Sequence, residues 1–297
     1  MKLKIYFILI IKVCFCFDGA AQGLHQTYAY ANELLRLEQF EPALHTYHRV
    51  LFFGEGAYQE TIYQQMGNCY FELGEYDQAA RYFDLAYFKE DNDSIRTELT
   101  FKKTFSLLLD KNFTYAQMEL FNLPDSLSTY FAQKRDFYSG ITYFGLEEFS
   151  DSEQFFLGAI PEREKDARYR LEAIFDQLEK VEKINPNKAR ILSMFIPGLG
   201  QIYAGDWGAG INSFILNGGL IALGVHTAVQ FTLFDAAITI LPWYQRFYMG
   251  GYMGAEKAAF DKIASKRGEI YRDVLEVIEE TKKKEQPALG NLSKSLN

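Results

Sequence analysis

Two histidines are the first candidates for chemistry in this chain of 297 residues. His45 and His48 are three residues apart, which places them on one face of a helix, where two imidazoles can bind a metal ion. A metal site needs further ligands, and no third ligand stands at a suitable local spacing. We therefore expect surface histidines beside a helical core and no metal site.

Other reactive side chains do not combine into a catalytic group. Glu147 with Glu148, and Glu279 with Glu280, lie in charged helical stretches where solvation accounts for them. Cys69 is the only cysteine beyond the amino-terminal segment, so it is expected to be a small core residue. No nucleophile can be paired with a base. The chain is predicted not to be an enzyme and to need no cofactor.

A glycine-rich segment near residue 200 has the outer spacing of a phosphate-binding loop. Gly200 and Gly205 stand at its ends, but Asp206 and Trp207 occupy the places where Lys and Ser or Thr would be required. A carboxylate there repels phosphate. The formal net charge of -8 likewise repels nucleic acid, and no basic stripe overrides it. Neither nucleotides nor nucleic acids are expected as partners.

The elements that position these residues follow a repeat. Phe40, Tyr76, Phe113 and Phe149 recur at intervals of 36, 37 and 36 residues. Each is followed by a small residue and then by a large apolar residue four positions further on: Ala43 and Tyr47, Ala79 and Phe83, Ala116 and Leu120, Ser152 and Phe156. This spacing is that of one helix face, and a period in the 30s indicates stacked helical hairpins. The predicted fold class is all-α.

The second unit resembles the tetratricopeptide repeat at the signature positions Tyr63, Met66, Gly67, Tyr70, Gly74, Tyr76, Ala79, Phe83 and Ala86. The third unit departs from the family, because Lys103 and Thr104 stand where an apolar and a small residue are preferred. That departure predicts a distorted third hairpin. The resemblance covers residues 24–160, and a charged closing helix over 161–185 completes a repeat domain at 24–185.

The resemblance implies a groove that is lined by the first helix of each unit and binds a protein. The positions carried over are Tyr28, Asn32, Gln64, Asn68, Phe71, Phe101, Phe105, Phe137, Ile141 and Phe144. Relatives that clamp a carboxylate tail use Lys and Arg, whereas Tyr28 and Phe101 occupy such places here. The apolar end of the groove favours a hydrophobic or amphipathic segment of a partner protein. Alternatively, the closing helix fills the groove through Tyr169, Leu171, Ile174 and Phe175.

Residues 1–21 have the pattern of a signal peptide. Lys2 and Lys4 precede an apolar stretch that only Lys12 interrupts, and Gly19, Ala20 and Ala21 supply small residues for a signal peptidase. Cleavage after Ala21 would export the protein, and an uncleaved anchor is the alternative. The predicted location is the cell envelope, with the repeats on the periplasmic side.

Residues 188–262 are predicted to form a membrane-associated helical hairpin. From Trp207 to Phe234 there are 28 consecutive residues without a formal charge, and about 20 helical residues span a bilayer. Polar residues weaken this helix, so we expect it to pair with residues 236–255, with a turn near 230–235. Small residues at four-residue spacing let such backbones approach: Gly218 and Ala222, Gly224 and Ala228, Gly250 and Gly254, Gly251 and Ala255.

A short motif precedes this hairpin and contains Pro197, Gly198, Gly200, Gln201, Tyr203 and Gly205. It resembles the PGxGQxYxG motif of small two-helix membrane modules of the TM2 class, which in some bacterial exported proteins follows tetratricopeptide repeats. From the residues alone, Pro197 ends any preceding helix, the glycines permit a tight turn, and Tyr203 suits a membrane interface. The motif therefore predicts contact with membrane lipid.

The flanking charges leave the topology open. Lys188, Arg190, Lys257 and Lys262 flank the open end of the hairpin, where the positive-inside rule prefers cytoplasm, whereas a cleaved signal places that end outside. Either the signal peptide determines the side of the membrane on which the open end lies, or the hairpin enters one leaflet without crossing. Within the hairpin, Asp235 and Arg246 either pair, or Arg246 extends its charge to the membrane surface while Asp235 lies in the turn. An amphipathic helix over 263–285 and a loose tail over 286–297 complete the predicted organisation.

These observations predict an all-helical, exported, membrane-attached scaffold whose repeats bind protein. The alternative is an accessory factor for membrane-protein assembly or transport that acts through its hairpin.

Overall fold

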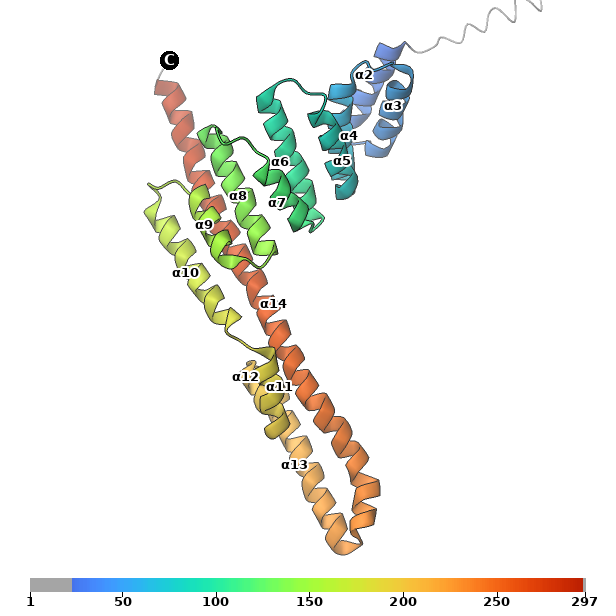
Figure 1. Ribbon diagram of the computed structural model, residues 1–297, viewed down its shortest axis with the longest axis vertical. Helices are drawn as coiled ribbons and strands as arrows, with labels where there is room; N and C mark the ends of the chain where they lie inside the picture. The colour runs from blue at the N-terminus through green and yellow to red at the C-terminus, as the bar shows by residue number, and fades with distance from the viewer. Residues whose placement is uncertain (1–22, 296–297) are drawn as a thin grey trace, which may run out of the picture. The chain divides into compact units, whose positions relative to one another are not determined.

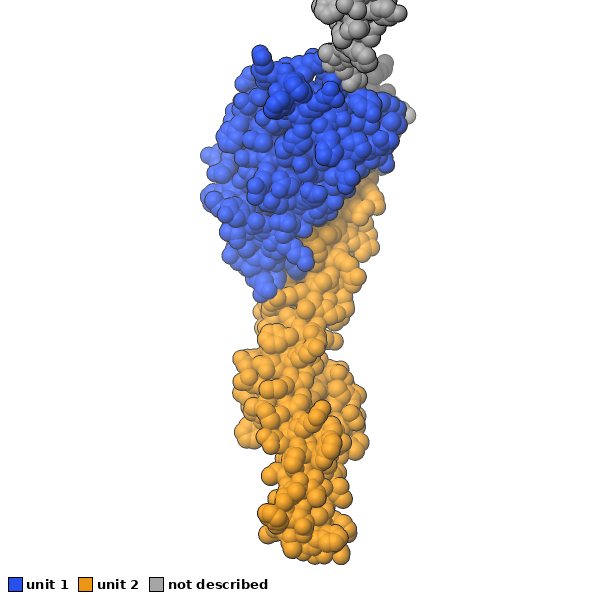
Figure 2. Space-filling view, turned by 90° about the vertical axis from the view of Figure 1, so that its right-hand side faces the viewer, with its two compact units in different colours: residues 1–159 blue, residues 160–297 orange. Residues whose placement is uncertain are grey.

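The computed structural model describes residues 23–295, with side chains as far as Lys284. The predicted signal peptide at 1–21 lies outside the described residues. Thirteen α-helices, labelled α2 to α14, and no strand are found in this range. The all-α prediction is confirmed. The chain divides into two compact units at residue 159, which Figure 2 colours separately.

Unit 1 consists of eight helices, which follow one another in Figure 1 from blue to green. They are α2 (Leu24–Arg36), α3 (Phe40–Phe53), α4 (Gln59–Glu72), α5 (Tyr76–Tyr87), α6 (Asp93–Leu109), α7 (Phe113–Phe121), α8 (Thr129–Gly145) and α9 (Phe149–Ala159). Each helix packs against the next one in sequence, and α6 also contacts α8. Consecutive pairs therefore form helical hairpins.

The first helix of each pair ends in the same turn. A left-handed residue follows each of these helices: Glu38 at φ 57°, Gly74 at 78°, Lys111 at 59° and Glu147 at 63°. The amide after each donates to a carbonyl five residues earlier, as Gln39 N does to Leu34 O and Glu75 N to Tyr70 O, both at 2.9 Å. This is the Schellman geometry, which satisfies helix-terminal carbonyls. The turns recur at 36, 37 and 36 residues, the period of the aromatic residues that open the second helices.

The small and large residues of the repeat pattern are all buried. The four small residues are fully buried, and Tyr47, Phe83, Leu120 and Phe156 are at most 7% exposed. Phe83 and Phe156 each pack on a glycine of the preceding helix, because a Cβ atom on Gly67 would lie 2.7 Å from the Phe83 ring and one on Gly140 would lie 2.6 Å from the Phe156 ring. The two helices of each of these hairpins therefore approach closely where one glycine packs on one phenylalanine.

The third hairpin accommodates its polar residues with ion pairs and hydrogen bonds. Lys103 of α6 pairs with Asp84 of α5 and, at 2.9 Å, with Glu119 of α7. Thr104 is fully buried and its hydroxyl donates to the Thr100 carbonyl at 2.8 Å. The departures from the repeat pattern are thus compensated locally, in a hairpin whose second helix, α7, has only nine residues.

Unit 2 contains α10 (Lys165–Glu182), α11 (Pro186–Phe195), α12 (Leu199–Tyr203), α13 (Trp207–Gln230) and α14 (Leu233–Ser295). The long helix α14 contacts each of the other four. It runs back along α13 after a turn at residues 231–232 (Figure 1). The Thr232 hydroxyl accepts from the Asp235 amide at 3.1 Å and donates to the Asp235 carboxylate at 2.6 Å, which caps the start of α14.

α14 is a single helix over residues that the sequence divided into a hairpin arm, an amphipathic helix and a loose tail. Pro242 lies within it and does not end it. The apolar stripe Ile270, Val274, Val277 and Ile278 is buried, as are Leu171, Phe175 and Leu178 of the helix it packs beside, α10. Ion pairs join the same two helices, Arg170 with Glu280 at 2.6 Å and Arg267 with Glu182 at 2.7 Å. This packing explains why the helix continues beyond residue 262.

Candidate functional site

A row of stacked aromatic rings joins the first helices of three successive hairpins. Phe71 of α4 stacks on Phe105 of α6 with ring centroids 5.5 Å apart, and Phe105 stacks on Tyr138 of α8 at 5.9 Å. We name these three residues the aromatic ladder. Phe105, at its centre, is 36% exposed. The ladder therefore offers an apolar surface that is already ordered by ring stacking.

Phe101 supports the aromatic ladder from below. It is fully buried, and its ring lies 5.6 Å from Tyr138 and 5.9 Å from Phe131. Of the predicted groove residues, Phe101 thus contributes to the core beneath the surface and cannot itself touch a partner.

The other predicted groove residues take separate positions in unit 1. Tyr28 stacks on Tyr58 at 4.4 Å, Asn32 accepts a hydrogen bond from the Tyr47 hydroxyl at 2.7 Å, and Gln64 is half-buried. Phe137 and Phe144 contact rings of α9, and Ile141 packs against the buried cluster around Leu107. From the predicted set, the structure stacks Phe71 on Phe105, and Asn68 accepts a hydrogen bond from Lys102, one turn from Phe105.

Tyr138 is the functional candidate that the sequence prediction missed. It follows Phe105 by 33 residues, and Phe105 follows Phe71 by 34. These intervals are shorter than the repeat period of 36 or 37 residues, so a search at that period does not find Tyr138, and its one signal in the sequence was its place beside the predicted Phe137.

A lysine without an ion pair lies beside the aromatic ladder. Lys102 is one turn from Phe105 on α6 and donates to the Asn68 side chain at 3.1 Å. No carboxylate among the described residues forms an ion pair with it. Burial lowers the pKa of Lys102, and the positive charge of Lys134 acts in the same direction against the opposing effect of Glu98. Lys134 itself pairs with Glu98 at 2.6 Å. The site therefore combines apolar rings with an ammonium group that forms no ion pair among the described residues.

Two glycines of the motif at residues 197–205 lie in close backbone contacts in unit 2. Gly198 has φ 95°, and a Cβ atom there would lie 2.1 Å from the Gly210 carbonyl oxygen. A Cβ atom on Gly200 would lie 1.8 Å from the Ala189 carbonyl oxygen. These contacts let α11, α12 and α13 cross within a few residues of Pro197, which stands between α11 and α12. Gly205, with φ 89°, makes the turn into α13.

Gln201 connects this crossing to α14 through buried hydrogen bonds. Its amide nitrogen donates to the Gly251 carbonyl at 2.8 Å, and its oxygen accepts from the Ser193 hydroxyl at 2.8 Å. Ser193 in turn accepts from the Gly200 amide at 2.9 Å. We call Ser193, Gly200, Gln201 and Gly251 the polar cluster. Tyr203 lies nearby, where its hydroxyl accepts from the Asn185 amide at 3.2 Å and its ring lies 5.3 Å from the Lys188 ammonium.

One helix of the described residues, α13, is long and apolar enough to cross a membrane by length and composition. The small residues of the hairpin divide into two sets. A Cβ atom on Gly224 or Gly251 would touch the opposite helix, whereas one on Gly218, Gly250 or Gly254 would meet nothing within 4 Å. The first set packs the hairpin and the second faces away from it. Asp235 bonds to Thr232, and no ion pair joins it to Arg246 in the described structure.

The candidate reactive residues are separate from both sites. Within the described residues, no group of three or more His, Cys, Asp or Glu side chains could hold a metal ion. His45 and His48 are exposed. Partial burial of the His48 ring, together with the charge of the neighbouring His45, lowers the pKa of His48. Cys69 is buried, which raises the pKa of its thiol to about 11 and keeps it protonated at neutral pH.

Comparisons with known proteins give no match: no family model, no curated protein and no solved structure is similar to this chain. Its function has to be argued from the two sites described above.

Proposed function

We propose that this protein is an exported, membrane-attached scaffold of tetratricopeptide-repeat type whose first helices bind a segment of a partner protein. The observation that carries the proposal is the aromatic ladder with Phe105 exposed at its centre. Aromatic side chains that are ordered before binding contribute apolar contact at a low cost in conformational entropy.

The chemistry beside the aromatic ladder defines the partner segment. Three rings from α4, α6 and α8 favour an apolar or amphipathic segment. Lys102, which has no ion pair among the described residues, favours an acidic side chain on the polar edge of that segment. An acidic amphipathic helix fits both features.

Membrane attachment is proposed to reside in unit 2. α13 exposes Ile211, Phe214, Ile215 and Val225, and the turn exposes Phe231, Leu233 and Phe234. Apolar side chains on all sides of a helical hairpin suit lipid better than water. The predicted export signal and the motif at residues 197–205 support the same proposal.

Changing Phe105 to aspartate tests the scaffold function. Site-specific photo-crosslinking from the neighbouring position 109 in intact cells, followed by mass spectrometry, would identify the partner, and the purified pair would give the affinity. Leu109 is suitable because it is 40% exposed on the same helix. Phe105→Asp is expected to weaken binding by about 100-fold, since a carboxylate replaces an apolar anchor beside the bound segment.

Phe121→Asp is the matched control, because Phe121 is 83% exposed on α7 and is not part of the aromatic ladder. It should keep the wild-type affinity. Equal affinities for both variants would contradict the proposed binding surface.

The outward-facing glycines favour a second candidate, an accessory factor that docks on other membrane helices. Gly250 and Gly254 leave open space on α14, where the backbone of another helix could approach. Changing both to leucine is expected to release a copurifying membrane complex without unfolding the hairpin, and copurification in detergent measures this. If the double variant retains the membrane complex while Phe105→Asp loses its partner, the accessory-factor function is contradicted and the scaffold function is supported.

A further inference from the structure

A polar cavity of about 530 Å³ lies in unit 1, and no residue of the aromatic ladder lines it. It is bounded by the end of α5, the first two turns of α6, the connection between α7 and α8, and the start of α8. Tyr87, Asp93 and Arg96 supply its charged and aromatic wall, and Leu123, Leu127 and Phe131 supply an apolar wall. Cavities of this size hold small molecules.

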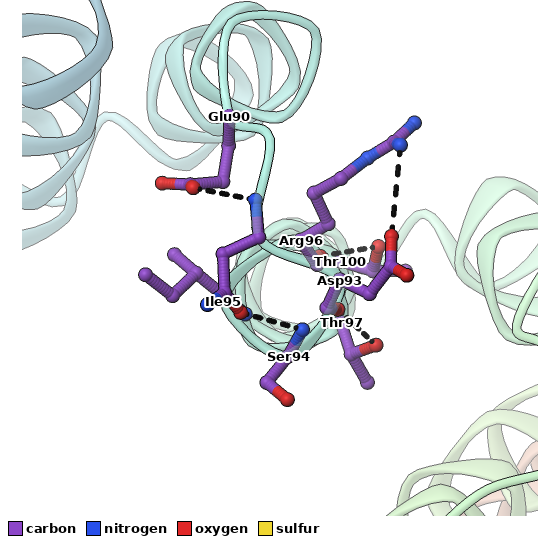
Figure 3. Close-up of polar contacts among 8 residues, drawn as sticks. Glu90, Asp93, Ser94, Ile95, Arg96, Thr97 and Thr100 are labelled. Carbon is purple, nitrogen blue, oxygen red and sulfur yellow. Dashed lines mark hydrogen bonds and ion pairs between the residues drawn. The ribbon is translucent and has the colours of Figure 1, made fainter.

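The guanidinium group of Arg96 is held in place but is poorly satisfied. Its central carbon lies 4.4 Å from the centroid of the Tyr87 ring, and its Nη1 atom is 3.9 Å from the Asp93 carboxylate, which is beyond hydrogen-bond distance. Its Nε atom is buried without a hydrogen-bond partner. Figure 3 shows the Arg96 side chain extending away from the axis of α6, with a dashed line from its guanidinium group to the Asp93 carboxylate. An oriented cation with unused donors suits a carboxylate ligand.

The Asp93 carboxylate is equally available. Its side chain is 98% exposed, and the long contact with Arg96 is its only ion pair among the described residues. The amide groups at the start of α6 are already used, because the Asn92 side chain accepts from Ser94 N at 2.9 Å and Ile95 N at 3.2 Å. The charged groups that line the cavity are one guanidinium and one carboxylate, joined only by this long contact (Figure 3).

We propose that this cavity binds a zwitterionic α-amino acid with an apolar side chain. The ligand carboxylate pairs with Arg96, the ligand ammonium pairs with Asp93, and the ligand side chain packs on Leu123, Leu127 and Phe131. The lining carries one charge of each sign, which matches a ligand of no net charge. Glu90 and Asp91 immediately precede the site and oppose binding of a net anion. This proposal does not depend on partner binding at the aromatic ladder.

Calorimetric titration of the full chain in detergent with L-leucine, L-phenylalanine and L-methionine tests the site. We expect at least one to bind with a dissociation constant below about 1 mM. For L-leucine, two analogues isolate the charges: 4-methylpentanoate lacks the ammonium and 3-methylbutylamine lacks the carboxylate. Each analogue is expected to bind about tenfold more weakly than its amino acid, because one charge-assisted contact is lost.

Two variants assign the contacts. Arg96→Gln and Asp93→Asn should each weaken binding of the amino acid by about tenfold or more. Arg81→Gln is the control, because Arg81 forms an exposed ion pair with Asp77 on α5 and does not line the cavity. Circular dichroism establishes that each variant is folded, and Asp93→Asn changes an exposed side chain, so it remains informative if Arg96→Gln unfolds.

Three results would overturn the assignment. The first is the absence of binding by all three amino acids at about 10 mM. The second is equal binding of an amino acid and its amine or acid analogue. The third is wild-type affinity in a folded Asp93→Asn variant.

Discussion

Gly200→Ala is expected to disrupt the crossing of α11, α12 and α13 and to destabilise unit 2 by more than about 3 kcal/mol. The added Cβ atom would lie 1.8 Å from the Ala189 carbonyl oxygen and 2.6 Å from the Ser193 hydroxyl. A backbone oxygen cannot rotate away as a side chain can, so α11 and α12 would have to separate. Separation would also break the hydrogen bond from the Gly200 amide to Ser193 and expose Gln201.

Gly218→Ala is the matched control on α13, because its Cβ atom would meet nothing within 4 Å. Alanine favours a helix over glycine, so this variant should be neutral or slightly stabilised. Thermal unfolding and limited proteolysis of the full chain in detergent measure both changes, with cleavage expected near residues 196–206 only in Gly200→Ala. Indistinguishable unfolding of the two variants would show that the close contact at Gly200 is not required.

The repeat pattern predicted much of the packing in unit 1. Ala43 with Tyr47 and Ser152 with Phe156 were assigned to helix faces from spacing alone, and the structure buries all four. Spacing is informative here because a helix places residues four apart on the same face.

The turns could not be predicted in the same way. Glu38, Lys111 and Glu147 occupy left-handed positions where glycine would be the usual signal, and only Gly74 supplies it. Their geometry is imposed by the helices on either side, which pack against each other and must be joined by three residues. Glycine at position 111 would remove a local strain that the hairpin packing now holds in place.

The candidate sites are formed by contacts between helices, and the spacing of residues in the sequence does not predict those contacts. Phe71 and Phe105 were predicted to line one surface, but Phe101 was predicted beside them and is buried. Phe101 and Phe105 lie one turn apart on the same face of α6, so their spacing does not distinguish them, and Phe101 is buried because Phe131 and Tyr138 of α8 pack on its ring. The hydrogen bond from Lys102 to Asn68 likewise depends on the position of α4 beside α6, which sequence spacing does not give.

The hydrogen bonds of the polar cluster could not be predicted either, because they join residues far apart in the sequence. Gln201 was predicted as a residue of the motif that precedes the hairpin, and its hydrogen bond to Gly251 joins residues 50 positions apart in the sequence. The motif therefore has a structural explanation within unit 2: its glycines allow the helices to cross, and its glutamine satisfies backbone and hydroxyl groups that the crossing buries.

Phe156→Ala is expected to destabilise unit 1 by about 3–5 kcal/mol. Phe156 is fully buried, and its ring fills the space left by Gly140 and lies 6.2 Å from the Phe137 ring. Removing the ring leaves a cavity that Gly140 cannot fill, because glycine has no side chain to move into it. The hydroxyl of Ser152, which donates to the Gly140 carbonyl at 2.8 Å, holds the two helices at their present distance and limits their collapse into the cavity.

Phe121→Ala is the control for the loss of a phenylalanine without a buried cavity. Because Phe121 is 83% exposed, this substitution should lower the free energy of unfolding by less than about 0.5 kcal/mol. Urea unfolding followed by circular dichroism gives both values, and the midpoint should fall for Phe156→Ala with little change in slope. If Phe156→Ala lowers the free energy of unfolding only slightly, α8 and α9 can move together and fill the space of the missing ring. The contact between glycine and phenylalanine would then be a consequence of the helix packing in unit 1 and not its cause, and the same test at Phe83 against Gly67 would be expected to give the same answer.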